Sequence, residues 1–146
     1  SLGFQTSLNP YEATPAHICC VIRGEGMVKH LNPLHTVVAG LRKGSVVGYK
    51  YFDFGQDDSA TSMELVMEVR GNGETGKLRV MLDDPETGTC LAETTFYGDD
   101  TLLRMKTPCV TGRHALYFVF DDPRTQMSWG IHDRELIAIE QFVFTK

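Results

Sequence analysis

The sequence has no excess of basic residues and no long apolar run, and each absence narrows the choice of partners. Its 14 lysines and arginines against 19 aspartates and glutamates give a formal net charge of −5. That charge argues against a nucleic-acid backbone or an anionic membrane as the main partner. No apolar run approaches the roughly 20 residues that span a bilayer. We therefore expect neither nucleic acid nor a membrane among the partners.

Cysteines are few, and their spacing argues against both a zinc site and a disulfide scaffold. The four cysteines include no Cys-x-x-Cys pair of the kind that binds zinc. Cys19 and Cys20 are neighbours, which rarely bridge each other, whereas Cys90 and Cys109 would pair if their strands were adjacent. The main expectation is four free thiols. Free thiols favour a reducing compartment such as the cytoplasm, or an anaerobic source.

Catalytic signatures are also missing. The chain has no Gly-x-Ser-x-Gly elbow, no phosphate-binding loop and no dinucleotide fingerprint. No motif singles out two of the 19 acids as the carboxylate pair of a glycosidase. We expect a non-catalytic protein that needs no cofactor. A stand-alone enzyme would require a deep pocket with two facing carboxylates.

The clearest pattern in the chain lies in residues 62–70. Apolar side chains alternate there with mostly polar ones, at Met63, Leu65, Met67 and Val69. A period of two predicts a half-buried strand. Strand composition recurs in shorter segments, at residues 15–22, 46–54, 78–82, 90–96, 102–105, 116–120 and 136–144. Many short strands with turns about every ten residues predict an all-β sandwich or barrel.

The length of the chain fits one domain. A chain of 146 residues can bury about 70% of its unfolded surface. We expect residues 1–10 to be a linker or leader and residues 11–146 to form the β-sandwich. The chain starts at Ser1 and shows no signal-peptide pattern, so we expect it to be a piece of a longer protein.

Several phrases follow one another in an order typical of one family. They are Asn9-Pro10-Tyr11 and residues 44–55, 76–83, 111–120 and 137–144. In this order and spacing the chain resembles a family 6 carbohydrate-binding module over residues 9–144. The resemblance implies a galactose-binding-like jelly-roll β-sandwich appended to a glycoside hydrolase, for example of family 43. It also implies non-catalytic binding of an oligosaccharide or polysaccharide, with the catalytic domain of the parent enzyme as a second partner.

The finer implications concern the ligand and the location. Such modules commonly bind plant-type glycan, such as xylan or arabinoxylan. A typical member would be secreted or attached to the cell surface, whereas four free cysteines are also compatible with the cytoplasm.

The resemblance implies a structural calcium, but the sequence departs from the usual ligands. Family members hold this ion in part with acids of the first strand and of the last. Pro15 and His17 stand at the first-strand positions, and only Glu140 matches the last-strand acid. Calcium needs oxygen ligands and a neutral imidazole is a poor one. We therefore expect this site to be weak or absent, which leaves Glu140 as a surface or hydrogen-bonded acid.

The sugar site also departs from the family pattern. Members usually stack a sugar ring on a tryptophan that follows two glycines, because ring C–H groups pack on an aromatic face. Here Asp100 stands at that tryptophan position, and Glu135 aligns with the usual polar residue near the last strand. Binding is therefore expected to be weak or altered.

Substitute ligand-binding residues are available nearby. Trp129, the only tryptophan, lies in a polar loop and is a candidate sugar platform. Its alternative role is packing over a sheet edge or on a neighbouring domain. Tyr97 is a second candidate platform, and Asp99 and Asp100 are candidates for binding hydroxyls, unless they only form a strand end and a solvated turn.

A face of the sheet is a further possibility, with Tyr49, Tyr51 and Arg104 as contributors, although packing is the commoner role for such residues. Two functions follow from these interpretations. One is a glycan-binding module, and the other is a degenerate module that serves as a structural domain on its catalytic partner.

Overall fold

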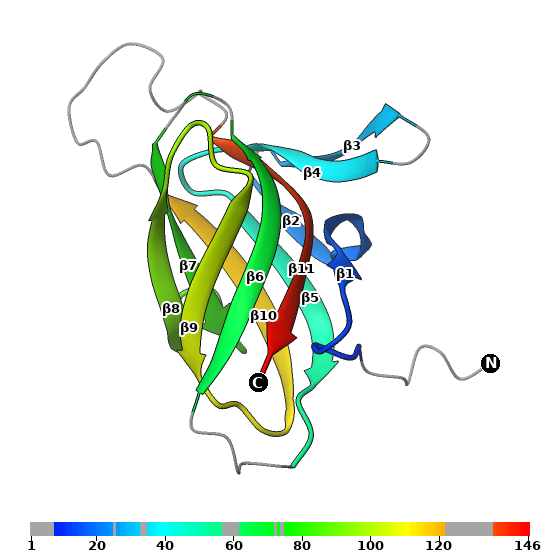
Figure 1. Cartoon of the computed structure of the whole chain (residues 1–146), viewed down its shortest axis with the longest axis vertical. Coiled ribbons are helices and arrows are strands. Elements are labelled where there is room, and N and C mark those ends of the chain that lie inside the picture. The colour runs from blue at the N-terminus through cyan, green and yellow to red at the C-terminus, as the bar shows by residue number, and fades with distance from the viewer. Residues whose placement is uncertain are drawn as a thin grey trace.

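A computed structural model describes residues 8–24, 26–32, 35–56, 62–71, 73, 75–121 and 136–146 as two antiparallel sheets packed face to face (Figure 1). One sheet has six strands in the order β3-β4-β11-β6-β9 with β1 paired to β11, and the other has five in the order β2-β5-β10-β7-β8. The predicted all-β sandwich is confirmed. The strands are β1 (Thr14–Pro15), β2 (Val21–Arg23), β3 (Met27–Asn32), β4 (His35–Leu41), β5 (Val46–Asp53), β6 (Ser62–Gly71), β7 (Gly76–Leu82), β8 (Thr89–Phe96), β9 (Leu102–Pro108), β10 (Arg113–Asp121) and β11 (Ile137–Thr145).

Strand β6 confirms the alternation predicted from the sequence. It lies between β11 and β9, and its alternate apolar side chains point into the core. These side chains, Met63, Leu65, Met67 and Val69, are at most 2% exposed. The polar residues between them consequently point to the outer face of the six-stranded sheet.

Aromatic rings join the two sheets. Tyr49 of β5 and Phe118 of β10 both pack edge-on against Phe142 of β11, with ring centroids 4.9 Å apart in each pair. Edge-to-face pairs of this kind contribute beyond the area that they bury. They fix the five-stranded sheet against the six-stranded one.

The strand composition of residues 15–22 is misleading, and the predicted single strand is wrong there. The segment consists of β1, a short 3₁₀ helix η2 (Ala16–Ile18), and β2. Pro15 has no N–H to donate to a ladder, which weakens strand pairing at this point. Ala16 is fully buried, and its carbonyl accepts a hydrogen bond from the hydroxyl of Tyr49 at 2.8 Å.

The sandwich begins before the predicted boundary at residue 11. Leu8 N donates to Tyr51 O at 2.8 Å, and Asp53 N donates to Leu8 O at 3.0 Å. Phe144 N donates to Pro10 O at 2.8 Å. Residues 8–10 are thus hydrogen-bonded to both sheets and belong to the folded domain.

Strands β3 and β4 were not predicted from the sequence. They form an antiparallel pair at one end of the six-stranded sheet, and the pair extends beyond the body of the sandwich (Figure 1). None of the helices in the described part of the chain has the length and apolar character needed to cross a membrane.

All four cysteines are free, as predicted from their spacing. Cys20 and Cys90 are exposed, whereas Cys19 packs partly against the core. Burial raises the pKa of the Cys19 thiol, so this thiol is less reactive than an exposed one.

Candidate functional site

The turn between β8 and β9 carries three of the predicted ligand-binding residues. Asp100 N donates to Tyr97 O at 3.0 Å, which closes the turn. The Asp100 carboxylate accepts from Tyr97 N at 2.9 Å, as aspartates in turns commonly do. One carboxylate oxygen of Asp100 therefore holds the backbone in place.

This turn is docked on the end of β6 and on Gly73. Val69 N donates to Thr101 O at 3.0 Å, Gly71 N to Asp100 O at 3.2 Å and Gly73 N to Gly98 O at 3.1 Å. Three backbone contacts in succession give the β8–β9 turn a fixed position, as a preformed binding site requires.

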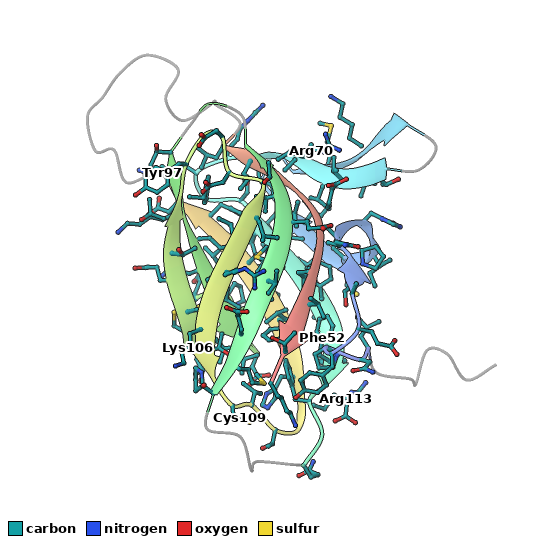
Figure 2. All side chains as sticks on the ribbon, in the orientation of Figure 1. Phe52, Arg70, Tyr97, Lys106, Cys109 and Arg113 are labelled. Carbon is teal, nitrogen blue, oxygen red and sulfur yellow. The ribbon has the colours of Figure 1, made fainter. Side chains whose placement is uncertain are left out.

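The ring presented by this turn belongs to Tyr97, which is 56% exposed. Asp99 is also exposed, and Asp100 is half-buried. The structure thus brings Tyr97, Asp99 and Asp100 together at one end of the sandwich, with Tyr97 far from Phe52 and Arg113 at the other end (Figure 2). Trp129 and Glu135, the other predicted ligand-binding residues, lie outside the described residues.

A cavity of about 560 Å³ lies beside the turn, on the outer face of the six-stranded sheet. Its walls come from β6, β9 and β11 and from the residue that precedes β9, and they are Glu68, Val69, Arg70, Thr101, Leu102 and Glu140. A smaller cavity of about 80 Å³ shares Glu68 and Leu102 with it. Together they form a shallow groove that begins where the turn ends.

The polar side chains of this groove are paired across the strands. Gln141 donates from Nε2 to the Glu68 carboxylate at 2.6 Å. Arg70 Nη2 lies 3.3 Å from Glu140 Oε1. Planar polar groups of this kind can hydrogen-bond a pair of neighbouring hydroxyls on a sugar ring.

Sequence reasoning missed Glu68, Arg70 and Leu102 as site residues. The alternation in residues 62–70 already placed Glu68 and Arg70 on the outward face of a strand. What the alternation could not reveal is that β11 brings Glu140 and Gln141 alongside them.

The residues present do not fit a calcium ion. Glu140, the predicted metal ligand, is ion-paired with Arg70. Pro15 offers no side-chain oxygen and His17 offers an imidazole, whereas calcium takes six to eight oxygens. Among the described residues, no three His, Cys, Asp or Glu side chains are grouped closely enough to hold a metal.

The three residues proposed for a sheet face do not form one site. Tyr49 is fully buried in the core, and burial raises the pKa of its hydroxyl well above the usual value. Tyr51 lies on the five-stranded sheet with the Arg113 guanidinium 4.5 Å from its ring centroid. Arg104 lies on the other sheet and pairs with Glu64 at 3.0 Å.

No family model matches the sequence, and no curated protein matches it. Solved structures with the same fold do exist. The chain is a two-sheet β-sandwich, and solved structures of family 6 carbohydrate-binding modules have the same fold. The fold predicted from the sequence resemblance is confirmed.

Three solved structures illustrate the similarity. CsCBM6-3 from Clostridium stercorarium, in complex with cellobiose, has a TM-score of 0.72 and 20% identity over 97% of this chain and 98% of that one. A family 6 module from Clostridium cellulolyticum, in complex with xylose, has a TM-score of 0.72 and 21% identity over 95% of this chain and 100% of that one.

The third similar structure is a larger enzyme. A family 43 arabinoxylan arabinofuranohydrolase from Bacillus subtilis, in complex with cellotetraose, has a TM-score of 0.69 and 22% identity. The match covers 97% of this chain but only 28% of the enzyme. A fold of this kind therefore occurs within a glycoside hydrolase chain that is several times longer.

Proposed function

We propose that this chain is a non-catalytic carbohydrate-binding module that binds plant-type glycan, such as xylan or arabinoxylan, at the end of the sandwich that carries Tyr97. The observation that carries the proposal is the exposed Tyr97 ring, held on a docked turn in the fold of family 6 modules. Solved structures of that fold contain xylose or cellobiose, which supports a neutral glycan as the ligand.

Binding is expected to be weak. Asp100 stands where the resemblance places a tryptophan, and its carboxylate is already bonded to the backbone of the turn. A single tyrosine ring offers less stacking surface than an aromatic pair. We expect a dissociation constant of about 1 mM, which corresponds to roughly 4 kcal/mol.

The test is a titration of the chain with xylo-, arabino- and cello-oligosaccharides, followed by calorimetry and by fluorescence of Trp129. Trp129 is the only tryptophan, so its emission reports on one place in the chain. Saturable heat with at least one sugar is expected. Tyr97→Ala should reduce the affinity at least about tenfold, which is the loss of one stacking contact.

Tyr51→Ala is the matched control for Tyr97→Ala. Tyr51 is also an exposed tyrosine, but it lies near the C-terminal end of β5, where the Arg113 guanidinium lies over one face of its ring. Its loss should leave the affinity unchanged. No heat with any sugar at millimolar concentration, or equal losses in both variants, would refute a glycan site at Tyr97.

A second function is favoured by a separate observation. Ile18 of η2 and Met27 and Val28 of β3 are exposed apolar side chains, and β3 is an edge strand of its sheet. In the Bacillus subtilis enzyme the similar part is 28% of the chain, which supports a neighbouring catalytic domain as the partner. The module would then serve as a structural domain.

Hydrogen exchange separates the two functions. If β3 packs on a catalytic domain, amides of β3 should exchange more slowly in the longer protein than in this chain alone, and sugars should not bind. Equal exchange in both forms contradicts the structural function.

A further inference from the structure

Glu140 is the one acid that the resemblance assigns to calcium, and it already has a positive charge beside it. The Glu140 side chain is 21% exposed, and its Oε1 lies 3.3 Å from Arg70 Nη2. A partly buried carboxylate is stabilised by a neighbouring charge or by hydrogen bonds. A guanidinium supplies both, and it stays protonated at any physiological pH.

The pairing follows from the sheet register. Arg70 of β6 lies opposite Ala138 of β11, and the register of β11 then shifts between Ile139 and Gln141. Such a shift marks a β-bulge, which re-aims the side chains beside it. The two charged side chains meet across neighbouring strands as a result.

A calcium ion at Glu140 would have to share this place with the guanidinium. Two cations a few ångströms apart repel each other strongly where water is partly excluded. Arg70 would have to leave before the metal could bind, and Pro15 and His17 offer the metal no carboxylate in exchange.

The first segment of the domain is attached to the sandwich by contacts that need no metal. Thr14 and Pro15 pair with Phe142 and Gln141 of β11, and Phe144 N donates to Pro10 O. The Tyr49 hydroxyl donates to the Ala16 carbonyl inside the core. These contacts join residues 10–16 to β11 and to β5.

We propose that Arg70 takes the place of the structural calcium in this chain. Its guanidinium neutralises Glu140, while β1 and the Tyr49–Ala16 hydrogen bond hold the first segment in position. The sandwich therefore folds without metal, whether or not the domain binds glycan.

The first test compares the melting temperature of the whole chain in excess EGTA and in calcium chloride. A ligand that binds only the folded state raises the melting temperature. We expect a difference below about 1 °C, and no saturable heat when about 1 mM calcium chloride is added to the chelated protein. A higher melting temperature in calcium by several degrees, or a saturable titration, would overturn the proposal.

The second test uses Arg70→Gln with Arg104→Gln as its matched control. Arg104 also pairs with a glutamate across two strands of the same sheet, but its side chain is 60% exposed and that of Glu64 is 43% exposed. Because more exposed pairs contribute less, we expect Arg70→Gln to lower the melting temperature by about 2–4 °C and Arg104→Gln by about 1 °C or less.

The double variant Arg70→Gln/Glu140→Gln completes the test. Arg70→Gln takes the guanidinium away from the Glu140 carboxylate, and Glu140→Gln then removes that carboxylate. The second substitution should therefore restore part of the stability that Arg70→Gln loses. Equal effects of Arg70→Gln and Arg104→Gln, or a double variant no more stable than Arg70→Gln alone, would show that Arg70 does not neutralise Glu140. The EGTA comparison on the unaltered chain stands even if Arg70→Gln does not fold.

Discussion

Gly71 of β6 lies so close to Gly98 of the β8–β9 turn that no side chain fits between them. A Cβ atom on Gly71 would lie 2.6 Å from the carbonyl carbon of Gly98, a distance shorter than van der Waals contact. The same residue donates its N–H to Asp100 O. This contact places Tyr97 and Asp99 relative to the sheet, so the geometry of the candidate site depends on a glycine that carries no functional group.

Gly71→Ala should therefore displace the β8–β9 turn. We expect a loss of about 1–3 kcal/mol in the free energy of unfolding, because the backbone must move to admit the methyl group. Glycan affinity should fall as well, since Tyr97 moves with the turn. Urea denaturation and calorimetric titration with the best oligosaccharide measure the two effects.

Gly55→Ala is the control for this substitution. Gly55 has a φ of +81°, and a Cβ atom added to it would meet no other atom within 4 Å, so alanine there costs about 1–2 kcal/mol through backbone strain alone. It follows β5, at the opposite end of the sandwich from the β8–β9 turn. Equal losses of glycan affinity in Gly71→Ala and Gly55→Ala would contradict a positioning role for Gly71.

Replacement by alanine should have different effects at Asp99 and at Asp100. Asp100→Ala removes the acceptor for Tyr97 N and should lower the free energy of unfolding by about 1 kcal/mol. Asp99 is exposed, so Asp99→Ala should change stability by less than about 0.5 kcal/mol. If Asp99 binds a sugar hydroxyl, its variant should lose affinity at unchanged stability. Thermal denaturation with parallel titrations distinguishes the two roles, and a stability loss in Asp99→Ala as large as in Asp100→Ala would contradict them.

Tyr49→Phe should destabilise the domain without disturbing its packing. The change removes only the hydroxyl that donates to Ala16 O and leaves a carbonyl of a fully buried residue without this donor. We expect a loss of about 1–3 kcal/mol, measured by urea denaturation. Tyr51→Phe, at an exposed tyrosine of the same strand, should cost less than about 0.5 kcal/mol. A Tyr49→Phe variant as stable as Tyr51→Phe would show that this hydrogen bond contributes nothing net.

Strand β5 shows how far the sequence could predict this structure. The apolar and aromatic composition of residues 46–54 predicts a strand, and the strand is present. Simple alternation from Tyr49 would bury Tyr51, yet Tyr51 is exposed and Phe52 is buried. The pairing of β10 with β5 shifts register between His114 and Leu116. A bulge of this kind moves later side chains to the other face of the sheet, and residue periodicity alone does not predict it.

The same limit applies to the candidate site. The turn at Tyr97–Asp100 was predictable because glycine and aspartate favour turns. The groove beside it was not, since Arg70 and Glu140 are 70 residues apart and meet only through the pairing of β6 with β11. Local patterns specify strands and turns, whereas the order of strands in a sheet decides which side chains become neighbours.

Asp84 should contribute to the acid sensitivity of the domain. In the turn between β7 and β8 its carboxylate accepts hydrogen bonds from Thr87 N and Glu86 N, each at 2.8 Å. These two bonds, the one from Thr87 first, lower the pKa of Asp84 in the folded state. A carboxyl group with a lowered folded pKa stabilises the protein above its unfolded pKa, and this contribution is lost as the pH falls through the folded value.

Asp84→Asn tests this linkage, because an amide oxygen can still accept both bonds but does not titrate in this range. We expect the variant to lose less stability than the unaltered chain between about pH 5 and pH 2, measured by urea denaturation at several pH values. Asp99→Asn is the control, since Asp99 is an exposed aspartate of another turn, and its acid profile should follow that of the unaltered chain. Identical profiles for all three proteins would mean that the turn hydrogen bonds do not depend on the charge of Asp84.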